Sequence, residues 1–297
     1  MKVIDYSKKS SEPLILVLGF FDCLHIGHLK LIERAEKIAR ETNCKACLFT
    51  FEDANLSDGG SVLSFSERLE KAGRYGVNIV LKANFDERFK TTSPEDFLLK
   101  LYSTLDIKGI VCGYDYTFGF KAEGKVDTLA KFCKERNVPL EIVEKQEFNG
   151  VRISTTHIKS LLKEGKIEEA NEILGEPYFI DGVVVNGRQV GRTLGFPTAN
   201  TDIDKGKFRI KDGVYKTLVS ADGKEYEGIT NYGARPTFGL TSVTVETYLK
   251  NFDGNLYEKK ITLFFDSFLR ETKKFDNADC LKAQLEADRK EAIRRIK

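Results

Sequence analysis

The sequence has no long apolar run and almost no net charge. None of its apolar stretches approaches the roughly 20 residues that a membrane-spanning helix needs, and residues 1–11 lack the apolar core of a signal peptide. The net charge is only +2, with 47 basic and 45 acidic side chains, so electrostatics give no reason to expect nucleic acid as the main partner. We therefore expect a cytoplasmic protein that binds neither a membrane nor a nucleic acid.

Cysteine is scarce and scattered, and histidine is rarer still. The six cysteines do not cluster as in a small disulfide-rich secreted protein, which favours a reducing compartment. Cys44 and Cys47 have CxxC spacing, but zinc takes about four ligands, and no second pair of that kind exists. We interpret them as two thiols packed at the start of a strand. A mixed zinc site with His25 and His28 is the alternative.

The first half of the chain alternates strand-like and helix-like segments. Apolar runs predict strands at residues 14–18, 46–51, 79–81, 109–112 and 140–143. Helical spacing predicts helices at residues 26–40, 66–75 and 127–136, and Ser93-Pro94-Glu95-Asp96 caps a further helix. This alternation indicates an α/β Rossmann-like domain, a parallel sheet with flanking helices that binds ligands beyond the carboxyl ends of its strands.

The second half is rich in strands. Two short helices are expected at residues 156–163 and 167–174, and Gly175-Glu176-Pro177 ends them. Strands are expected at residues 179–185, 213–220, 225–229, 243–249 and 259–265, separated by glycine and Asp/Asn turns. The pattern predicts a small antiparallel β-barrel, closed by a charged C-terminal helix at residues 279–295. We expect domains at residues 1–175 and 176–297.

A glycine-bearing turn links the first expected strand to the first expected helix. It reads Gly19-Phe20-Phe21-Asp22-Cys23-Leu24-His25-Ile26-Gly27-His28. The N–H groups and dipole of a helix N-terminus attract anions, and Gly27 lets phosphates approach the backbone. His25 and His28, three residues apart, can donate hydrogen bonds to a triphosphate and to the charge that develops at an attacked phosphorus. A helix cap without further role is the alternative, which is weakened because the chain has only three histidines.

A second polar loop is expected at Gly191–Asn200, where two glycines and a proline make a poor strand. The oxygens of Thr198 and Asn200 suit Mg²⁺ together with phosphate oxygens. An asparagine folded onto its own backbone is the alternative for Asn200.

The histidine turn resembles the GxFDxxHxGH signature of the nucleotidylyltransferase superfamily, in which the two histidines contact the triphosphate. Two further segments resemble the prokaryotic bifunctional riboflavin kinase/FAD synthetase family. Residues 111–119, VCGYDYTFG, are similar to its VGxDFxFG segment, and residues 152–159, RISTTHIK, to its SSTxxR segment. The resemblance implies a flavin site with Asp115 and Phe118. It also implies nucleotide-binding residues in this half: Gly19, Phe20, Asp22, Gly27, Ser154, Thr155, Thr156 and Lys159.

Several alternatives and two departures accompany this resemblance. Ser154 or Thr155 would also serve as a helix cap, Asp115 as a turn residue and Phe118 as core. Lys159 stands where the family has arginine, which loses the planar fork that grips phosphate. The loop Glu52–Asn55 lacks the family's prolines and histidine. Slower adenylylation is therefore a hypothesis.

Residues 191–200, GRTLGFPTAN, match the riboflavin kinase motif over ten positions, and the other kinase segments follow in order. The resemblance implies that Thr198 and Asn200 bind magnesium and that Glu246 is the general base for the riboflavin 5′-hydroxyl. It implies nucleotide contacts for Gly182, Gly187, Gly191 and Arg192, and flavin contacts for Gly213, Tyr215 and Arg270. A solvated glutamate and a surface ion pair are the alternatives for Glu246 and Arg270.

The family resemblance implies an enzyme that phosphorylates riboflavin with ATP to FMN and then adenylylates FMN with ATP to FAD, releasing pyrophosphate. Its co-substrate is ATP, its metal Mg²⁺, and its product ligands FMN and FAD. Two alternatives remain: an enzyme in which only one module is active, the kinase being the more secure, and a regulator that binds flavin or nucleotide without turnover.

Overall fold

The computed structural model describes residues 1–52, 59–186, 198–234 and 243–273 and, near the C-terminus, residues 280, 283, 284 and 286–288. The chain divides into two compact units, Met1–Thr155 and Thr156–Lys297. We describe each unit by itself.

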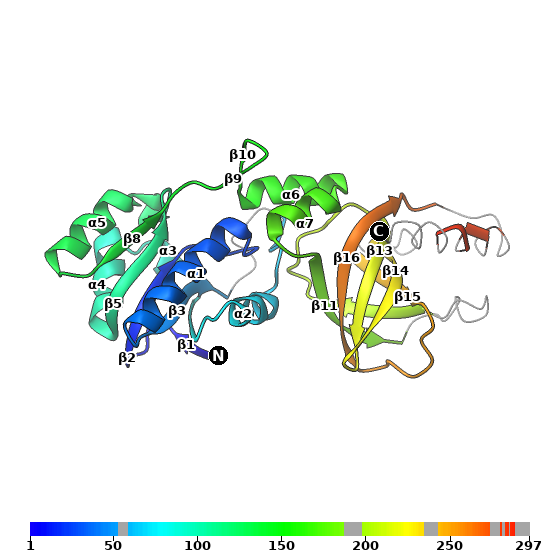
Figure 1. Cartoon of the computed structure of the whole chain (residues 1–297), viewed down its shortest axis with the longest axis horizontal. Helices are drawn as coiled ribbons and strands as arrows, with labels where there is room; N and C mark the ends of the chain where they lie inside the picture. The colour runs from blue at the N-terminus through cyan, green and yellow to red at the C-terminus, as the bar shows by residue number, and fades with distance from the viewer. Residues whose placement is uncertain are drawn as a thin grey trace. The chain divides into compact units, whose positions relative to one another are not determined.

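The first unit contains a six-stranded sheet in which every neighbouring pair is parallel, in the order β1-β4-β3-β2-β5-β8 (Figure 1). Its strands are β1 (Lys2–Asp5), β2 (Ser10–Leu18), β3 (Lys45–Phe51), β4 (Ile79–Ala83), β5 (Leu105–Gly113) and β8 (Leu140–Val143). The predicted parallel sheet is confirmed. The edge strand β1 has no counterpart among the predictions, because its four residues are too short to show a pattern.

Helices connect these strands. They are α1 (Ile26–Glu41), α2 (Phe65–Arg74), α3 (Glu87–Lys90), α4 (Pro94–Thr104) and α5 (Val126–Glu135). The predicted start of α4 is confirmed: Ser93 is its N-cap, and the Ser93 hydroxyl accepts the backbone N–H of Asp96 at 3.0 Å. Two short antiparallel pairs complete the unit, β6 (Thr117–Phe118) with β7 (Gly124–Lys125), and β9 (Glu147–Phe148) with β10 (Val151–Arg152).

The central strand β2 sets the place of the first candidate site. Its last five residues, Leu14–Leu18, are almost completely buried, as expected for a strand covered on both faces. Leu18 lies between Phe49 of β3 and Cys112 of β5 in the parallel register. The carboxyl ends of three strands therefore meet where the chain turns into α1.

The second unit is a closed antiparallel barrel with the order β11-β12-β15-β14-β13-β16. Its strands are β11 (Tyr178–Val185), β12 (Thr198–Ile203), β13 (Gly213–Ala221), β14 (Lys224–Ala234), β15 (Val243–Leu249) and β16 (Lys260–Arg270). A chain of buried hydroxyls crosses its interior, with Thr230 2.9 Å from both Thr217 and Thr247. The predicted barrel is confirmed.

One expectation about this barrel is wrong. A loop is expected over Gly191–Asn200, of which residues 191–197 lie outside the described residues, but residues 198–200 are the first residues of β12. The intrinsic preference of these residues is weak, but β12 pairs with β11 on one side and β15 on the other. These two ladders override the local preference.

Helices α6 (Thr155–Glu164) and α7 (Ile167–Leu174) precede the barrel and are attached to it (Figure 1). The Asn171 side chain of α7 donates to the carbonyl of Phe265 at 2.8 Å and accepts the N–H of Tyr178 at 2.7 Å. The carbonyl of Leu162 in α6 accepts the N–H of Lys211. These bonds explain why α6 and α7 are counted with the barrel and why the first compact unit ends at Thr155. The domain boundary that we expect at residues 175/176 stays a prediction.

The expected C-terminal helix is described only in part: residues 280, 283, 284 and 286–288 are helical. The predicted ends at residues 279 and 295 lie outside the described residues. Among the described helices, none is long and apolar enough to cross a membrane.

Candidate active sites

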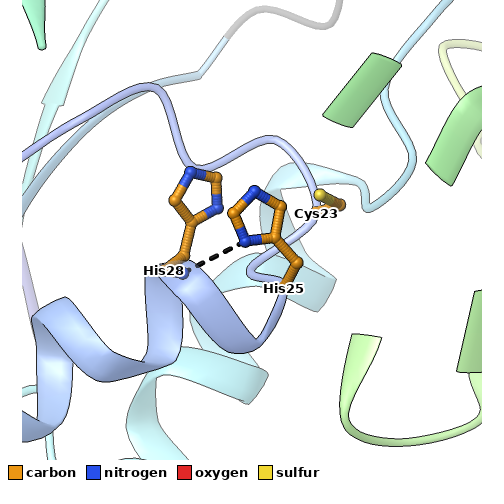
Figure 2. Close-up of side chains that lie close together, drawn as sticks. All are labelled: Cys23, His25 and His28. Carbon is orange, nitrogen blue, oxygen red and sulfur yellow. Dashed lines mark hydrogen bonds between the residues drawn. The ribbon is translucent and has the colours of Figure 1, made fainter. Parts of the chain in front are cut away.

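The first unit places His25 and His28 at the N-terminus of α1. His25 is the N-cap, and its Nδ1 accepts a 3.1 Å hydrogen bond from the backbone N–H of His28 (Figure 2). The two rings are stacked, with centroids 3.7 Å apart and planes 12° apart, so they face the same way as their spacing predicts. His25 does cap the helix through its Nδ1, as the capping alternative has it, but this alternative gives no role to the ring of His28.

Burial keeps both imidazoles neutral. It lowers the pKa of His25 to about 4. Burial, and then the neighbouring His25 and Lys71, hold the pKa of His28 well below its ordinary value. Because Nδ1 of His25 accepts a hydrogen bond, the proton of this neutral ring lies on Nε2. The His25 ring can therefore bind an anion by donating a hydrogen bond rather than by positive charge.

A polar cavity of about 240 Å³ lies beside the two histidines. It is bounded by the N-terminus of α1, the end of β5 and the segment that leads into α6. Its polar lining includes His25, His28, Asp115, Arg152, Ser154 and Thr155. A cavity at a helix N-terminus with hydroxyls, imidazoles and a guanidinium is suited to phosphate.

A larger cavity of about 620 Å³ adjoins the polar one, because His28, Leu31, Gly113 and Asp115 line both. Its walls are rich in aromatic rings, with Phe20, Phe51, Phe85, Phe89, Phe97 and Phe118 among the lining residues. Lys90 and Lys121 also line it. Its size and apolar walls suit a large flat ring system.

Asp115 lines both cavities and forms an ion pair with Arg152, which lines the polar cavity. The guanidinium of Arg152, on β10, donates to the Asp115 carboxylate and lies 5.6 Å from the centre of the Tyr114 ring. Sequence reasoning gave Arg152 no role, although it stands two residues before Ser154. The signal that it missed is a cation at the start of a segment that is expected to bind phosphate.

The glycines of the turn make room for neighbouring rings. A Cβ on Gly19 would lie 2.6 Å from the Phe21 ring, and one on Gly27 would lie 3.2 Å from the His25 ring. Gly27 lines the polar cavity, and Gly19 and Phe20 line the aromatic one. Nucleotide contact by these three residues stays a prediction.

Asp22 has a structural position. Its side chain is completely buried, and its Oδ1 accepts the N–H of Val62 at 2.9 Å. The Asp22 carbonyl also accepts the N–H of Leu63. Asp22 therefore fastens the segment before α2 to the turn, and its predicted nucleotide contact stays a prediction.

The segment at the start of α6 is divided between the units. Ser154 and Thr155 line the polar cavity, and the Thr155 hydroxyl lies 3.4 Å from the Cys23 sulfur. Thr156 and Lys159 belong to the second unit, where the Lys159 ammonium lies 5.0 Å from the centre of the Phe208 ring. Phosphate contact by these four residues stays a prediction.

The loop that departs from the family pattern is described only at its first residue. Glu52 pairs with Lys82 at 2.6 Å. Residues 53–58, which include Asp53, Ala54 and Asn55, lie outside the described residues.

In the barrel, three polar residues form a row across neighbouring strands. Glu246 of β15 lies opposite Asn200 of β12 on one side and opposite Asn231 of β14 on the other. Directly opposed residues share a face. Because their neighbours Thr247 and Thr230 are buried in the barrel, the row faces outward. The sequence alone indicates no role for Asn231, since only the strand register brings it beside Glu246.

Thr198 and Asn200 are two apart on β12 and so share the outward face. A hydroxyl oxygen and an amide oxygen beside the carboxylate of Glu246 are hard donors, and they fit a magnesium ion that also takes phosphate oxygens.

The remaining predicted residues of the barrel have packing roles. A Cβ on Gly182 would lie 2.4 Å from Thr201 Cγ2, and one on Gly213 would lie 2.3 Å from the Phe268 ring. Tyr215 is completely buried, and its hydroxyl donates to the carbonyl of Lys211. Nucleotide contact by Gly182 and flavin contact by Gly213 and Tyr215 stay predictions.

Arg270 forms a bidentate ion pair with Asp288, with nitrogen–oxygen distances of 2.8 and 2.7 Å. Both side chains are largely buried, so the pair ties the C-terminal segment to β16. The alternative of an ion pair at Arg270 is met, but the pair is largely buried and not at the surface, and stacking on a flavin stays a prediction. Gly187, Gly191 and Arg192 lie outside the described residues.

The cysteines are all described, and none forms a disulfide. Cys47 is buried in β3 and Cys44 directly precedes that strand, as the packing interpretation predicts. The cysteine that lies near the histidines is Cys23.

Two family models match the chain. One is described as FAD synthetase and covers residues 7–157, and the other is described as riboflavin kinase and covers residues 174–296. They fall on the sheet with its two cavities and on the barrel with its polar row.

Curated relatives match nearly the whole chain. Three of them, each named bifunctional riboflavin kinase/FMN adenylyltransferase, come from Listeria monocytogenes, Bacillus subtilis and Escherichia coli. Their identities are 33%, 30% and 32%. The matches cover 92%, 97% and 95% of this chain, and 90%, 94% and 92% of those proteins.

A solved structure from Streptococcus pneumoniae, described as a macrolide-efflux protein, is 28% identical and covers 98% of both chains with a TM-score of 0.86. The fold is therefore shared over the full length. With both modules matched and relatives above 30% identity along the chain, the protein belongs to the bifunctional riboflavin kinase/FMN adenylyltransferase family.

Proposed function

We propose that the protein makes flavin cofactors in two steps on two separate sites. The barrel transfers the γ-phosphoryl group of ATP to riboflavin, giving FMN and ADP. The first unit then transfers the AMP group of a second ATP to FMN, giving FAD and pyrophosphate. A cytoplasmic location, without nucleic acid or membrane partners, remains the expectation from the sequence.

One observation carries the adenylyl transfer: His28 lies in the wall shared by the aromatic cavity and the polar cavity. The flavin ring fits the aromatic cavity, and the triphosphate fits the polar one. The FMN phosphate then reaches the α-phosphorus near the start of α1. There the helix N-terminus and the neutral imidazoles stabilise the charge that develops as pyrophosphate leaves.

The kinase step uses the outward row of the barrel. The Glu246 carboxylate accepts the proton of the riboflavin 5′-hydroxyl as that oxygen attacks the γ-phosphorus. Thr198 and Asn200 would hold Mg²⁺ together with ATP phosphates, and the ion would neutralise phosphate charge. Asn231, on the other side of Glu246, offers an amide to the same substrates or to the carboxylate itself.

The test is a time course with riboflavin, ATP and Mg²⁺, in which FMN and FAD are separated by chromatography. We expect FMN to appear first and FAD to follow. FMN without FAD would leave a kinase with an inactive first unit. Neither product, from a folded protein, would favour the non-catalytic regulator.

A matched variant of each site sharpens the test. We expect His28→Ala to abolish FAD formation and spare FMN formation. We expect Glu246→Gln, which keeps the shape of the side chain, to slow FMN formation by about 10²- to 10⁴-fold and to spare FAD formation from supplied FMN.

A further inference from the structure

A buried cysteine lies beside the stacked imidazoles, and the proposed function does not use it. Cys23 is completely buried two residues before His25. Its sulfur, one ring nitrogen of His25 and one ring nitrogen of His28 all lie within 4.8 Å of one another, and Figure 2 shows the three side chains together. Among the residues that the structure describes, this is the one group of three or more such side chains that could share an ion.

The donors of this group have a chemistry of their own. A thiolate with two imidazoles is a ligand set that Zn²⁺ and Co²⁺ favour, whereas Mg²⁺ takes oxygen. In addition, Nδ1 of His28 is buried and has no hydrogen-bond partner in the described part of the chain. A buried nitrogen without a partner is unfavourable, and coordination of an ion would satisfy it.

Binding requires a rearrangement of the two rings. Because the rings are stacked, their in-plane lone pairs run side by side, and one ring must turn before both can reach one ion. Coordination at Nε2 of His25 would move its ring proton to Nδ1 and break the cap to the His28 N–H. The ring of His28 has room to turn, because it lines both cavities.

We propose that Cys23, His25 and His28 bind a thiophilic divalent cation of the Zn²⁺ class, and that the bound cation blocks adenylyl transfer while the kinase barrel stays active. The Cys23 thiol becomes a metal-bound thiolate and releases one proton to solvent, and no electron is transferred. A water molecule completes the coordination. The cation competes with nucleotide because it holds the imidazoles that would donate to the triphosphate. The inhibition rests on the proposed function, whereas the binding itself does not.

Binding is tested without activity, by titrating Co²⁺ into the full-length protein in the absence of nucleotide. We expect a thiolate-to-Co²⁺ charge-transfer band in the near ultraviolet that saturates at one equivalent and disappears on addition of Zn²⁺. Cys23→Ser should lose the band, and Cys280→Ser, at an exposed cysteine, should keep it. Absence of the band from the unaltered protein, or its persistence in Cys23→Ser, would overturn the site.

Inhibition is tested by adding Zn²⁺ in the presence of excess Mg²⁺ and ATP. We expect FAD formation to fall while FMN formation continues. The same inhibition of Cys23→Ser should need a Zn²⁺ concentration that is higher by about tenfold or more. Parallel loss of both products, or equal sensitivity of Cys23→Ser, would overturn the proposal. If the unaltered protein makes no FAD at all, the adenylyl transfer fails as a function, and the Co²⁺ titration still decides the site.

Discussion

His25 couples the stability of the first unit to pH. Burial lowers the pKa of His25 from 6.5, the ordinary value for histidine, to about 4, because it disfavours the charged imidazolium. Between pH 6.5 and 4 the unfolded chain takes up a proton that the folded chain does not. The free energy of unfolding therefore decreases as the pH falls through this window, and at pH 4 the decrease is about 3 kcal/mol. Above pH 6.5 the contribution is complete.

We predict that His25→Asn flattens this dependence. Asparagine keeps a side-chain acceptor for the helix cap, but it does not titrate. Urea unfolding at a series of pH values measures the change, and His157→Asn, in the second unit, controls for the loss of a histidine. An unchanged slope between pH 6.5 and 4 in His25→Asn would show that the imidazole of His25 does not carry the effect.

At this scale the sequence predicted what is local. The spacing of His25 and His28 on a helix is enough to predict that their rings face the same way. It did not predict that Arg152 pairs with Asp115, because the contact spans 37 positions and depends on how β10 folds back. Nor did it predict that Cys23 joins the histidines.

At the scale of elements, the strand β12 shows what the sequence alone does not predict. Glycine and proline before Thr198 favour a loop, and only the two neighbouring strands make residues 198–203 a strand. The same pairing creates the row of Asn200, Glu246 and Asn231. Strand periodicity predicts which face a residue takes, but the register that brings these three together is a property of the closed barrel.

The close approach of β11 and β12 requires glycine at position 182. A Cβ there would also lie 2.5 Å from the Asp202 carbonyl oxygen, which is backbone and cannot turn away. We predict that Gly182→Ala lowers the free energy of unfolding of the barrel by about 2 kcal/mol or more, measured by chemical denaturation.

Gly223 provides the control for this change. It has a φ of +72° in the turn between β13 and β14, and a Cβ there would meet nothing within 4 Å. Gly223→Ala should therefore cost only the strain of the left-handed conformation, about 1 kcal/mol. Equal losses in the two variants would contradict the packing argument for Gly182.

Asn231 provides a prediction that depends on the strand register. A carboxylate directly opposite Glu246 would place two like charges side by side on the outward face. We predict that Asn231→Asp lowers the rate of FMN formation by about tenfold or more, because the added charge repels Glu246 and the ATP phosphates. Asn231→Ala, which adds no charge, should lower the rate by less.

The matched control is Asn255→Asp, in the segment between β15 and β16. Asn255 accepts the N–H of Tyr257 through its side-chain oxygen, and aspartate keeps this bond. Its rate of FMN formation should equal that of the unaltered protein. If Asn231→Asp behaved in the same way, Asn231 would not share a site with the general base.

On the scale of the whole molecule, each unit carries one of the two proposed sites. His25, His28 and both cavities lie within Met1–Thr155. Glu246 lies within Thr156–Lys297, together with Asn200 and Asn231. The motifs predicted this division in outline. They did not predict where Lys159 lies, and slower adenylylation because of that lysine remains a hypothesis. Lys159→Arg should raise the rate of FAD formation if its ammonium binds phosphate.

The most direct test of two sites on one chain is to mix two variants, each lacking one activity. With riboflavin, ATP and Mg²⁺, His28→Ala alone should stop at FMN, and Glu246→Gln alone should form almost no product. Their mixture should form FAD, because FMN made by one variant is adenylylated by the other. A folded His28→Ala that also fails to make FMN, or a folded Glu246→Gln that cannot convert supplied FMN to FAD, would contradict the assignment of two separate sites.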